Sequence, residues 1–554
     1  MSLSPLLILP PEVIHHIIDY LDYEDILWSL RYVCRDLKEK IESYNRYRLD
    51  YRCIPNVKFK KICSLIRPEN VISLILADDD AISSGVFLTQ FNIKDFTRLY
   101  SLTLIRIREK HLIEFLQHLS PSTKYLSIEH QDSLTLSHET IELHSSILTK
   151  VRLSQLHMVT SNFIIINMRW PADYAIQNLA LRRCSCKQYL NLLRCLPNLH
   201  TLELLDFSTN DFADTFPFDL TLASFSHVKS LTITSNMMLM EMIRLVISLT
   251  RSIHYLKLSS LTRVLNIQNS IFDGSQWANF IETNLSELDK FEFLFQTFHT
   301  TCSGEALKQK LQTFVTPFQT SFWREHKHWF VNCTCIKGEL IELYSIPLCQ
   351  SNHVHDSKDN LISCSTLVMT PENETAMMDN VSHLSLALTD IPIAISSAQT
   401  ARTHEALYRR TTHLRLRLNS ADYKRRIWHL SSLVDMAYLR QISLSSKLDK
   451  DSNVRINYTV DALLKQTVNI RKLQISFGYR HQYDQILINV FPSTLLDKII
   501  YVVFNTGSEC RIDFILDRHR CSTNARAESL YNLDEASVSL VDWLKVNNRE
   551  YYIY

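Results

Sequence analysis

The stretch LPPEVIHHIIDYLDYEDILWSLRYVCRDLKEKI, which runs from Leu9 to Ile41, decides the architecture of the N-terminal part of the chain. Its apolar residues recur at helical spacing in three groups. The first group follows a pair of prolines, which suit the start of a helix because no intrahelical hydrogen bond is lost there. One broad apolar stripe results, formed by Val13, Ile14, Ile17, Ile18 and Leu21.

Two further helices are expected in the same stretch. Asp22 can cap the second helix with its carboxylate, and Asp25 lies in the first turn, where the helix dipole favours a negative charge. Three helices of about forty residues bury too little apolar surface to be stable alone, so the sequence predicts a module that docks on a partner. The second helix would bury Ile26, Leu27 and Leu30, and the third would bury Val33, Cys34, Leu37 and Ile41.

The same residues resemble the F-box pattern almost position for position. The matching segments are Leu9-Pro10, Glu12, Ile17-Ile18, Tyr20-Leu21-Asp22, Asp25-Ile26 and Val33-Cys34-Arg35. F-boxes of known proteins dock on the SKP-type adaptor of cullin-RING ubiquitin ligases. The resemblance therefore implies that the adaptor-binding residues are among Leu9, Pro10, Ile14, Ile18, Leu21, Ile26, Leu30 and Val33. The alternative is a helical cap that closes the end of the next domain.

A short motif of the form LxxLxL returns repeatedly beyond residue 70, beginning with VISLIL at Val71 to Leu76. Its fourth position marks each repeat. In each LxL the two leucines point to one face of a short strand, and one strand with one helix cannot bury that face, so neighbouring units must stack. The steps between markers, except the last, fall at the leucine-rich-repeat period of roughly 20 to 29 residues. The markers are Leu74, Leu102, Leu126, Val151, Leu179, Leu202, Leu231, Leu256 and Phe291.

This array resembles a leucine-rich-repeat protein with irregular repeats. The position that the family fills with Asn or Cys holds Cys184 and Asn236, but elsewhere it holds Ile107, Leu156, Phe207 and Leu261. The expected fold class is α/β, with an N-terminal three-helix F-box followed by an irregular leucine-rich-repeat solenoid with a small inserted β element. A plain α/β domain with buried parallel strands is the alternative.

The repeat rhythm breaks after Phe293, which indicates an insertion. Alternating and β-branched residues from Trp323 to Met369 are typical of strands, with Lys337-Gly338 as a hairpin turn and residues 350–360 as a polar loop. Repeats resume with the markers Leu384, Leu414, Ile442, Leu473 and Ile499. The expected organisation is an F-box at 1–50, a linker at 51–70, solenoid at 71–320, a β-hairpin element at 321–370, solenoid at 371–506 and a C-terminal cap at 507–554.

Residues that alternate with the leucines are expected to line the concave surface, where solenoids commonly bind partners. Basic residues predominate there, with Lys150, Arg152, Arg182, Lys257, Lys290, Arg415, Arg417, Lys472 and Lys498 against Glu129, Glu203 and Glu292. Guanidinium and ammonium groups pair with carboxylate and phosphate, so this face favours an acidic or phosphorylated protein target. The alternative is a set of ordinary solvated side chains. The predicted target-binding residues are Lys150, Arg152, Arg182, Lys257, Arg415, Arg417 and Lys472.

Soft metal ligands gather in the inserted element, at Cys333, Cys335, Cys349, His353, His355 and Cys364. Their spacings are CxC and HxH rather than the CxxC knuckle that wraps a zinc ion, so no metal site is predicted. No HExxH, Gly-rich phosphate loop or nucleophile motif occurs, and the six glycines lie far apart. We therefore expect no cofactor and no catalytic activity in the chain itself.

The bulk composition bears on the compartment. The chain has 554 residues, a formal net charge of +1 and 46% hydrophobic residues, so no overall charge draws it to nucleic acid or membrane. Its apolar runs are too short to span a bilayer. Thirteen cysteines, an odd number, follow no secretory signal, which favours reduced thiols in the cytoplasm or nucleus.

Together these patterns predict the substrate-recognition subunit of an SCF-type ubiquitin ligase. The F-box would dock on the SKP-type adaptor and, through it, on the cullin-RING ligase, while the solenoid holds a protein target. Two alternatives remain at this point: a repeat scaffold that works outside any ligase, and a nucleic-acid binder that uses the basic face. Nucleic acid is the less favoured partner because the chain is nearly neutral.

Overall fold

The computed structural model describes residues 8–21, 23, 25–52, 56–78, 84–130, 137–159, 175–211, 225, 227–236, 238–262, 270–298, 304–336, 339–355, 361–368, 370–391, 406–418, 423–445, 459–460, 462–463, 465–467, 469–470, 472–477, 501–506, 511–516 and 551–553. The chain forms two compact units. Unit 1 comprises Met1–Thr262, Asn269–Ile271 and Asn279–Phe291. Unit 2 comprises Arg263–Gln268, Phe272–Ala278 and Glu292–Tyr554.

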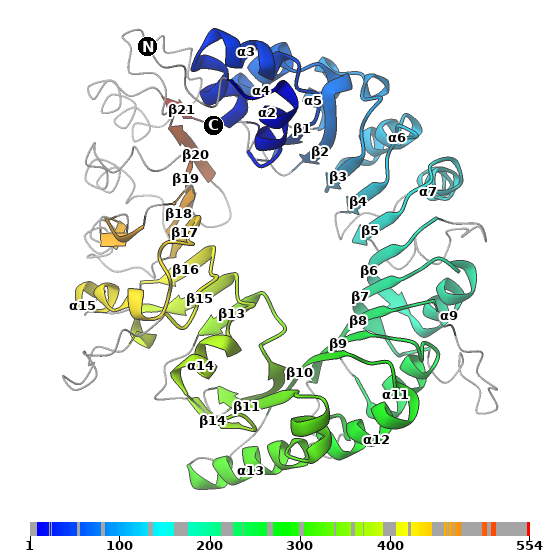
Figure 1. The fold of residues 1–554 in the computed structure, drawn as a ribbon, viewed down its shortest axis with the longest axis vertical. Helices are drawn as coiled ribbons and strands as arrows, with labels where there is room; N and C mark the ends of the chain where they lie inside the picture. Colours follow the sequence, from blue (N-terminus) through cyan, green and yellow to red (C-terminus); the bar gives the residue numbers. More distant parts are fainter. Residues whose placement is uncertain are drawn as a thin grey trace. The chain divides into compact units, whose positions relative to one another are not determined.

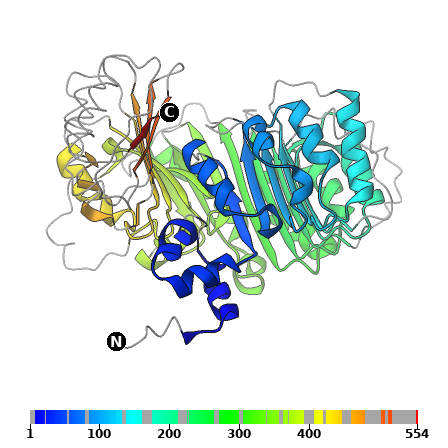
Figure 2. The same cartoon turned by 90° about the horizontal axis from the view of Figure 1, so that it is seen from above.

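The N-terminal module of unit 1 consists of short helices: α2 (Pro11–Ile18), η1 (Asp25–Ser29), η2 (Leu30–Tyr32) and α3 (Arg35–Glu42). Figure 2 shows them in dark blue as a group beside the first strands of the unit. The Lys40 ammonium donates to the Leu9 carbonyl at 2.8 Å, and His15 Nε2 donates to the Lys40 carbonyl at 3.0 Å, so α2 and α3 are joined directly.

The middle of this module differs from the expected single α-helix. Residues Asp25–Ser29 form a π-helical turn, and Leu30–Tyr32 form a 3₁₀ turn. Cys34 has an extended backbone, with φ −160° and ψ 167°, and α3 therefore begins only at Arg35. As a result Val33, which the sequence placed inside a helix and in the core, lies before α3 and is 68% exposed.

In the described part of unit 1, nine parallel strands follow, each paired with the next along the chain. They are β1 (Tyr47–Asp50), β2 (Val71–Ala77), β3 (Ser101–Ile105), β4 (Tyr125–Glu129), β5 (Gln155–Val159), β6 (Asn178–Ser185), β7 (Thr201–Ser208), β8 (Ser230–Ser235) and β9 (Tyr255–Thr262).

Helices lie on one face of these strands. Figure 1 shows α6, α7, α9 and α11 on the same side of strands β3 to β9. No described helix of unit 1 covers the other face. The helices that connect the strands are α4 (Asn56–Leu65), α5 (Ser84–Gln90), α6 (Glu109–Gln117), α7 (His138–Lys150), α9 (Cys186–Cys195) and α11 (Met240–Ser248), and α12 (Gly274–Asn284) follows β9.

Two rows of apolar side chains run across the strands of unit 1 toward the helices. One row consists of leucine throughout: Leu49, Leu74, Leu102, Leu126, Leu156, Leu179, Leu202, Leu231 and Leu256. The second row consists of Leu76, Leu104, Ile128, Met158, Leu181, Leu204, Ile233 and Leu258. All these side chains are buried, and each contributes about 1.5 to 3 kcal/mol by leaving water.

Residues 148–153 were expected to form a strand, but the strand of this repeat is β5, at Gln155–Val159. Helix α7 runs to Lys150, and the Val151 amide still donates to the Ile147 carbonyl at 2.8 Å, so the apolar residues of this segment follow the helix. The strand is β5, in which Leu156 takes the ladder position expected for Val151. Consequently, Lys150 ends a helix and Arg152 lies in the following turn, and neither is on a strand.

Residues 51–70, expected to form a linker, contain α4 and pack against the sheet. The ring of Phe59 in α4 is fully buried and meets Tyr51 edge to face at 5.2 Å between ring centroids. Ile62, one turn further along α4, is buried as well. This stretch is therefore part of the packed array.

Unit 2 contains the inserted β element. Strands β11 (Phe330–Ile336) and β12 (Leu340–Ile346) pair antiparallel, as a hairpin does; the expected turn at residues 337–338 lies outside the described residues. β14 (Leu361–Ser365) pairs antiparallel with β11, and the C-terminal half of β10 (Lys290–Phe298) pairs antiparallel with β12. α13 (Glu305–Val315) and a π turn at Phe322–His326 complete this region, and the Trp323 indole donates to the Gly274 carbonyl at 3.1 Å.

A second parallel sheet lies in unit 2. Its strands are β13 (Asn352–His355), β15 (His383–Ala387), β16 (His413–Arg417), β17 (Gln441–Ser445), β18 (Lys472–Phe477) and β19 (Tyr501–Thr506), followed by antiparallel β20 (Arg511–Leu516) and β21 (Tyr551–Ile553). Short helices α14 (Pro371–Met377) and α15 (Tyr423–Trp428) precede β15 and follow β16.

The first strand of this sheet corrects the interpretation of residues 350–360 as a solvated loop. Residues 352–355 form β13, and the register aligns His353 with Leu384 and His355 with Leu386. The two histidines therefore occupy the ladder positions that leucines fill in the following strands. His355 is buried and shares a hydrogen bond with the Tyr408 hydroxyl at 2.9 Å, which satisfies its polar ring in the core. The last marker also shifts: Val502, not Ile499, aligns with Leu473.

From the leucine rows we predict that an alanine substitution destabilises the protein far more on the buried face of the sheet than on the opposite face. Leu202→Ala removes a fully buried side chain between Leu179 and Leu231, and we expect it to destabilise the protein by about 2 to 5 kcal/mol. Thr232→Ala changes the opposite face of the adjacent strand and serves as the control, with an expected cost below about 1 kcal/mol. Urea unfolding followed by circular dichroism measures both; equal costs would contradict this assignment of faces.

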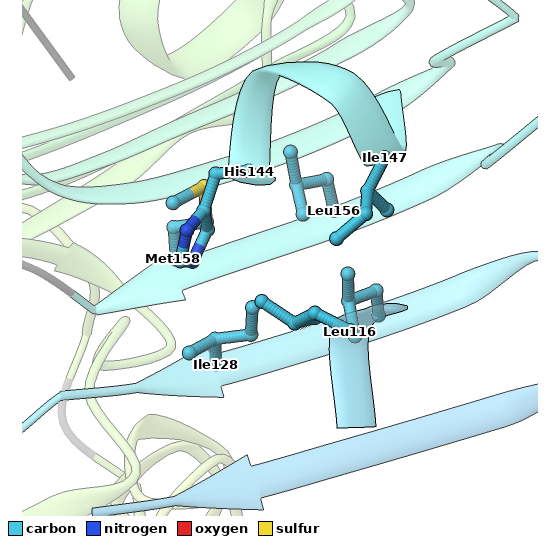
Figure 3. Close-up of a pocket in the computed structure, with 7 residues that line it drawn as sticks. Leu116, Ile128, His144, Ile147, Leu156 and Met158 are labelled. Carbon is cyan, nitrogen blue, oxygen red and sulfur yellow. The ribbon is translucent and has the colours of Figure 1, made fainter. Parts of the chain in front are cut away.

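Two buried histidines lie between α7 and the strands that it covers. His144 Nδ1 donates to the Thr140 carbonyl at 2.6 Å, while the Nε2 atoms of His144 and His130 have no hydrogen-bond partner. Figure 3 shows His144 and Ile147 of α7 over Leu156 and Met158 of β5, where they line a cavity of about 10 Å³. Burial lowers the pKa of His144, and burial lowers the pKa of His130 to about 3. Both rings are therefore neutral in the folded protein.

Acid should consequently destabilise unit 1. Below the ordinary histidine pKa of about 6.5, the unfolded chain binds protons that the folded chain excludes, so stability falls as the pH drops from there toward 3. At about pH 5.5 the protonation that the folded chain denies to His130 should cost roughly 1 kcal/mol relative to about pH 7.5, and His144 should add to the loss of stability in the same direction. His144→Leu removes one such group, so its melting temperature should fall less over this pH range than that of the wild type. An equal fall in both proteins would contradict the assignment.

Candidate functional site

The N-terminal module exposes large apolar side chains along one side of α2. Val13 and Ile17 lie four residues apart on this helix, and both are 41% exposed. Tyr20 continues the same side just after the helix, where its amide donates to the Ile17 carbonyl, and it is 91% exposed. Tyr32 and Val33, before α3, are also exposed. Such a concentration of exposed apolar residues on a small module is typical of a protein interface.

The eight residues predicted to bind the adaptor fall into three groups. Ile14, Ile18 and Ile26 are buried inside the module, so they cannot present a contact surface, and this corrects their predicted role. Leu9, Leu21 and Leu30 are half-buried. Pro10 and Val33 are exposed.

Val13, Ile17 and Tyr20 are surface residues that were not predicted as such from the sequence. The apolar stripe of α2 contains the adjacent pairs Val13-Ile14 and Ile17-Ile18, and residues next to each other on a helix point about 100° apart. Only the second member of each pair faces α3 and the core. These adjacent apolar pairs were the feature of the sequence that indicated a second, exposed apolar stripe.

Polar contacts hold the module in position within unit 1. Tyr44 donates its hydroxyl to Asp19 at 2.8 Å, and Arg46 pairs with the same carboxylate at 3.0 Å, so the end of α2 is braced against the segment that leads into β1. Arg31 in η2 pairs with Glu42 at the end of α3 at 2.8 Å. These contacts keep the exposed stripe of α2 in a defined orientation relative to α3.

The face of the unit 1 sheet that carries no described helix is nearly neutral in charge. Arg182 and Lys257 are half-buried there, and Lys290 at the start of β10 lies over the Tyr255 ring at 5.3 Å, while Glu129 and Glu203 offset two of these three positive charges. The middle row across this face is Ile75, Thr103, Ser127, His157, Ala180, Glu203, Thr232 and Lys257. Because Lys150 and Arg152 lie off the strands, the basic face of unit 1 has two fewer positive charges than predicted.

Unit 2 places basic and polar side chains together on its parallel sheet. A groove of about 300 Å³ crosses strands β13 to β17. One row across it consists of Asn352, His383, His413 and Gln441, and the next consists of Val354, Ser385, Arg415 and Ser443. We call this feature the β13–β17 groove. No Asp or Glu is among the described residues that line it.

Two histidines stack in the β13–β17 groove. The rings of His383 and His413 lie 4.2 Å apart between centroids, with an interplanar angle of 15°. Nδ1 of His383 shares a hydrogen bond with the Ser382 hydroxyl at 2.9 Å, and Nδ1 of His413 shares one with the Thr412 hydroxyl at 2.8 Å. These bonds fix the ring orientation on two adjacent strands.

Of the basic residues predicted from the sequence, Arg415 and Arg417 are exposed on β16, and Arg415 lines the groove. Neither guanidinium forms an ion pair or hydrogen bond with a described residue. In unit 1, by contrast, Arg106 pairs with Glu129 at 3.2 Å and Arg183 lies 3.7 Å from Asp206. Lys472 begins β18 beside Gln441, but its side chain lies outside the described part of the chain.

The cysteines of the inserted element are packed in its sheet. Cys333 and Cys335 are buried, and Cys333 lies opposite Cys364 on the neighbouring strand. Burial raises the pKa of the Cys333 thiol well above its ordinary value, which disfavours the thiolate that binds metals. Within the described ranges, no group of three or more His, Cys, Asp or Glu residues is placed to hold a metal ion. No helix in those ranges is long and apolar enough to cross a membrane.

Comparisons with known proteins address the N-terminal module most directly. Residues 6–49 match the F-box domain family. A search of curated proteins found no significant match. Among solved structures, the leucine-rich repeat-containing protein LegL7 from Legionella pneumophila is similar at 12% identity, over 70% of this chain and 88% of that chain, with a TM-score of 0.18. That score is too low to support a conclusion, so the repeat architecture rests on the parallel strands and aligned leucines of this chain.

Proposed function

We propose that this chain, which carries an F-box domain at residues 6–49, is the substrate-recognition subunit of an SCF-type ubiquitin ligase. The F-box docks on a SKP-type adaptor, and the leucine-rich-repeat strands bind a protein target. The F-box match carries this proposal, and the exposed apolar stripe of α2 supports it. The chain itself is not the enzyme: ubiquitin transfer belongs to other subunits.

The adaptor interface uses the exposed residues and is held in shape by the buried ones. Val13, Ile17 and Tyr20 on α2, with Val33 before α3, supply apolar area that a partner removes from water at about 25 cal/mol per Å². Leu9, Pro10, Leu21 and Leu30, which are half-buried or exposed, remain proposed contacts of the adaptor. Ile14, Ile18 and Ile26 support the interface from within the module, because their burial keeps the helices packed.

The contribution of such a receptor to the reaction is proximity. A target held on the repeat strands has its lysines at a high effective concentration near the charged ubiquitin carrier, which turns an encounter in solution into a step within one complex. This role requires no catalytic residue in the chain.

Target recognition is assigned to strand residues that face away from the helices. Arg182 on β6, Lys257 on β9, and Arg415 and Arg417 on β16 remain in this set because they belong to strands. Lys472, the first residue of β18, stays a predicted member of it. Lys150 and Arg152 are left out because α7 and its following turn hold them. The nine described cysteines are all free, which fits a cytoplasmic or nuclear protein.

Adaptor binding tests the proposal. In the full chain, replacing Ile17, Tyr20 and Val33 together by alanine should weaken binding of a purified SKP-type adaptor at least about 100-fold, because three exposed apolar anchors are lost. Leu9→Ala with Pro10→Ala should also reduce binding. Isothermal titration calorimetry measures both.

A matched control uses exposed aromatic residues of unit 2. Trp428 and Tyr438 are 59% and 57% exposed, and their replacement by alanine should leave adaptor affinity unchanged. Each variant is compared with the wild type by circular dichroism and melting temperature. The proposal fails if the wild-type chain does not bind the adaptor, or if the folded triple variant binds as well as the wild type; a scaffold independent of any ligase is then the better description.

A further inference from the structure

We infer that unit 1 binds a soft monovalent metal ion, Cu(I), between α7 and the carboxyl ends of β4 and β5. Its ligands are the Nε2 atoms of His130 and His144 and the thioether sulfur of Met158. This inference goes beyond the proposed function and does not depend on it, because these residues lie on the helix-covered side of the sheet and not on the face assigned to target recognition.

The tautomer of His144 leaves one ring nitrogen ready to bind a metal. Its Nδ1 lies 2.6 Å from the Thr140 carbonyl oxygen, which can only accept a hydrogen bond, so Nδ1 carries the proton. In the neutral ring the Nε2 atom then has a bare lone pair, and this atom is buried without a hydrogen-bond partner. Metal-binding histidines are oriented in the same way, with the second ring nitrogen donating to a carbonyl or carboxylate.

His130 brings a second ring of the same kind next to His144. It directly follows β4, its amide donates to the Val159 carbonyl at 2.8 Å, and its Nε2 is also buried without a partner. The two rings lie 5.6 Å apart between centroids, with an interplanar angle of 47°. Two imidazoles that each place Nε2 about 2.0 Å from a shared ion have centroids about 5 to 6 Å apart, so this spacing suits one ion between them.

Met158 supplies the third, soft ligand. Its side chain and that of His144 both line the small cavity under α7 (Figure 3), whose volume of about 10 Å³ is near the minimum for one water-sized occupant. Among the described side chains that line this cavity, His144 is the only strong hydrogen-bonding group, and a buried water needs two or more such partners. The other lining residues are Leu116, Leu126, Ile128, Ile147 and Leu156.

The ligand set favours Cu(I) over zinc. Thioether sulfur is a soft ligand that selects Cu(I), and imidazole binds copper well. Structural zinc sites have four ligands, whereas the described residues place no group of three or more His, Cys, Asp or Glu where it could hold a metal ion. A single positive charge also costs less to bury among aliphatic side chains than a double charge does.

The protonation state of the site suits a cation. Burial lowers the pKa of His144 and lowers that of His130 to about 3, so a metal ion displaces no proton from either ring near neutral pH. The negative charge of Glu109 acts on both rings in the direction opposite to burial. The Ser137 amide donates to this carboxylate at 2.7 Å, which fixes a negative charge close to the bound cation.

Titration of the full chain with Cu(I) tests the inference. The methionines carry ¹³C in their methyl groups, and accessible thiols are alkylated first, because free cysteines also bind Cu(I). Cu(I) is added without oxygen, at concentrations set by a competing chelator. We expect the Met158 methyl signal, assigned by its absence from Met158→Leu, to shift in step with one bound ion, and the melting temperature to rise by at least about 2 °C.

Two variants remove ligands with little change in packing. His144→Leu introduces an aliphatic side chain like those that surround it, and it should weaken Cu(I) binding at least about 100-fold and remove the Met158 shift. Met158→Leu nearly conserves side-chain volume and should weaken binding about 10-fold. Competition with the chelator measures both affinities, and circular dichroism compares the fold of each variant with that of the wild type.

The matched control replaces His383 and His413 of unit 2, another close pair of histidine rings, by alanine. It should leave the Cu(I) affinity and the Met158 shift unchanged. An unmoved Met158 signal at saturating Cu(I), or an unchanged affinity in folded His144→Leu, would overturn the inference, and a buried water would then be the better partner for the two Nε2 atoms. Tighter binding of Zn(II) than of Cu(I) at these residues would overturn the assignment of the metal.

Discussion

The structure depends on the burial of two apolar residues from each of the strands β2 to β9 against the same residues of their neighbours. A single strand with its helix cannot remove both from water, whereas in unit 1 the aligned rows from Leu49 to Leu256 and from Leu76 to Leu258 are buried throughout. This constraint sets the strand register and, with it, the face on which every alternate residue lies. The side chains between the leucines do not pack in this core. They can therefore change to suit a binding partner without loss of the fold.

The N-terminal module shows the opposite case, in which apolar surface is left unburied. Its helices are too few to bury all their apolar residues, and α2 therefore keeps one stripe inside, with Ile14 and Ile18, and a second outside, with Val13 and Ile17. An exposed stripe is unfavourable for an isolated protein and favourable for one that docks. The match of residues 6–49 to the F-box domain gives this surplus of apolar surface a consistent explanation.

Recognition chemistry is distributed unevenly along the repeats. In unit 1 the outward residues are mostly neutral, and arginines such as Arg106 and Arg183 have acidic neighbours. In the second sheet of unit 2, histidines, hydroxyls and Arg415 share one groove, and none of its described lining residues is acidic. This groove differs from the continuous basic surface that the sequence suggested, because its described basic side chains gather on neighbouring strands of one sheet.

The sequence by itself determined the F-box module, the α/β class, the repeat period and most of the strands, because these follow from local apolar spacing that few other folds tolerate. Only the tertiary structure decided the register. The apolar residues around Val151 fit a helix end as well as a strand, and only pairing with β4 and β6 places Leu156 in the ladder and moves Lys150 and Arg152 off the face. Likewise, the sequence predicted that His353 and His355 lie in a polar loop. In the structure they belong to β13, aligned with Leu384 and Leu386. Such long-range pairings leave no local signal, because the energy that selects them comes from residues about a repeat away.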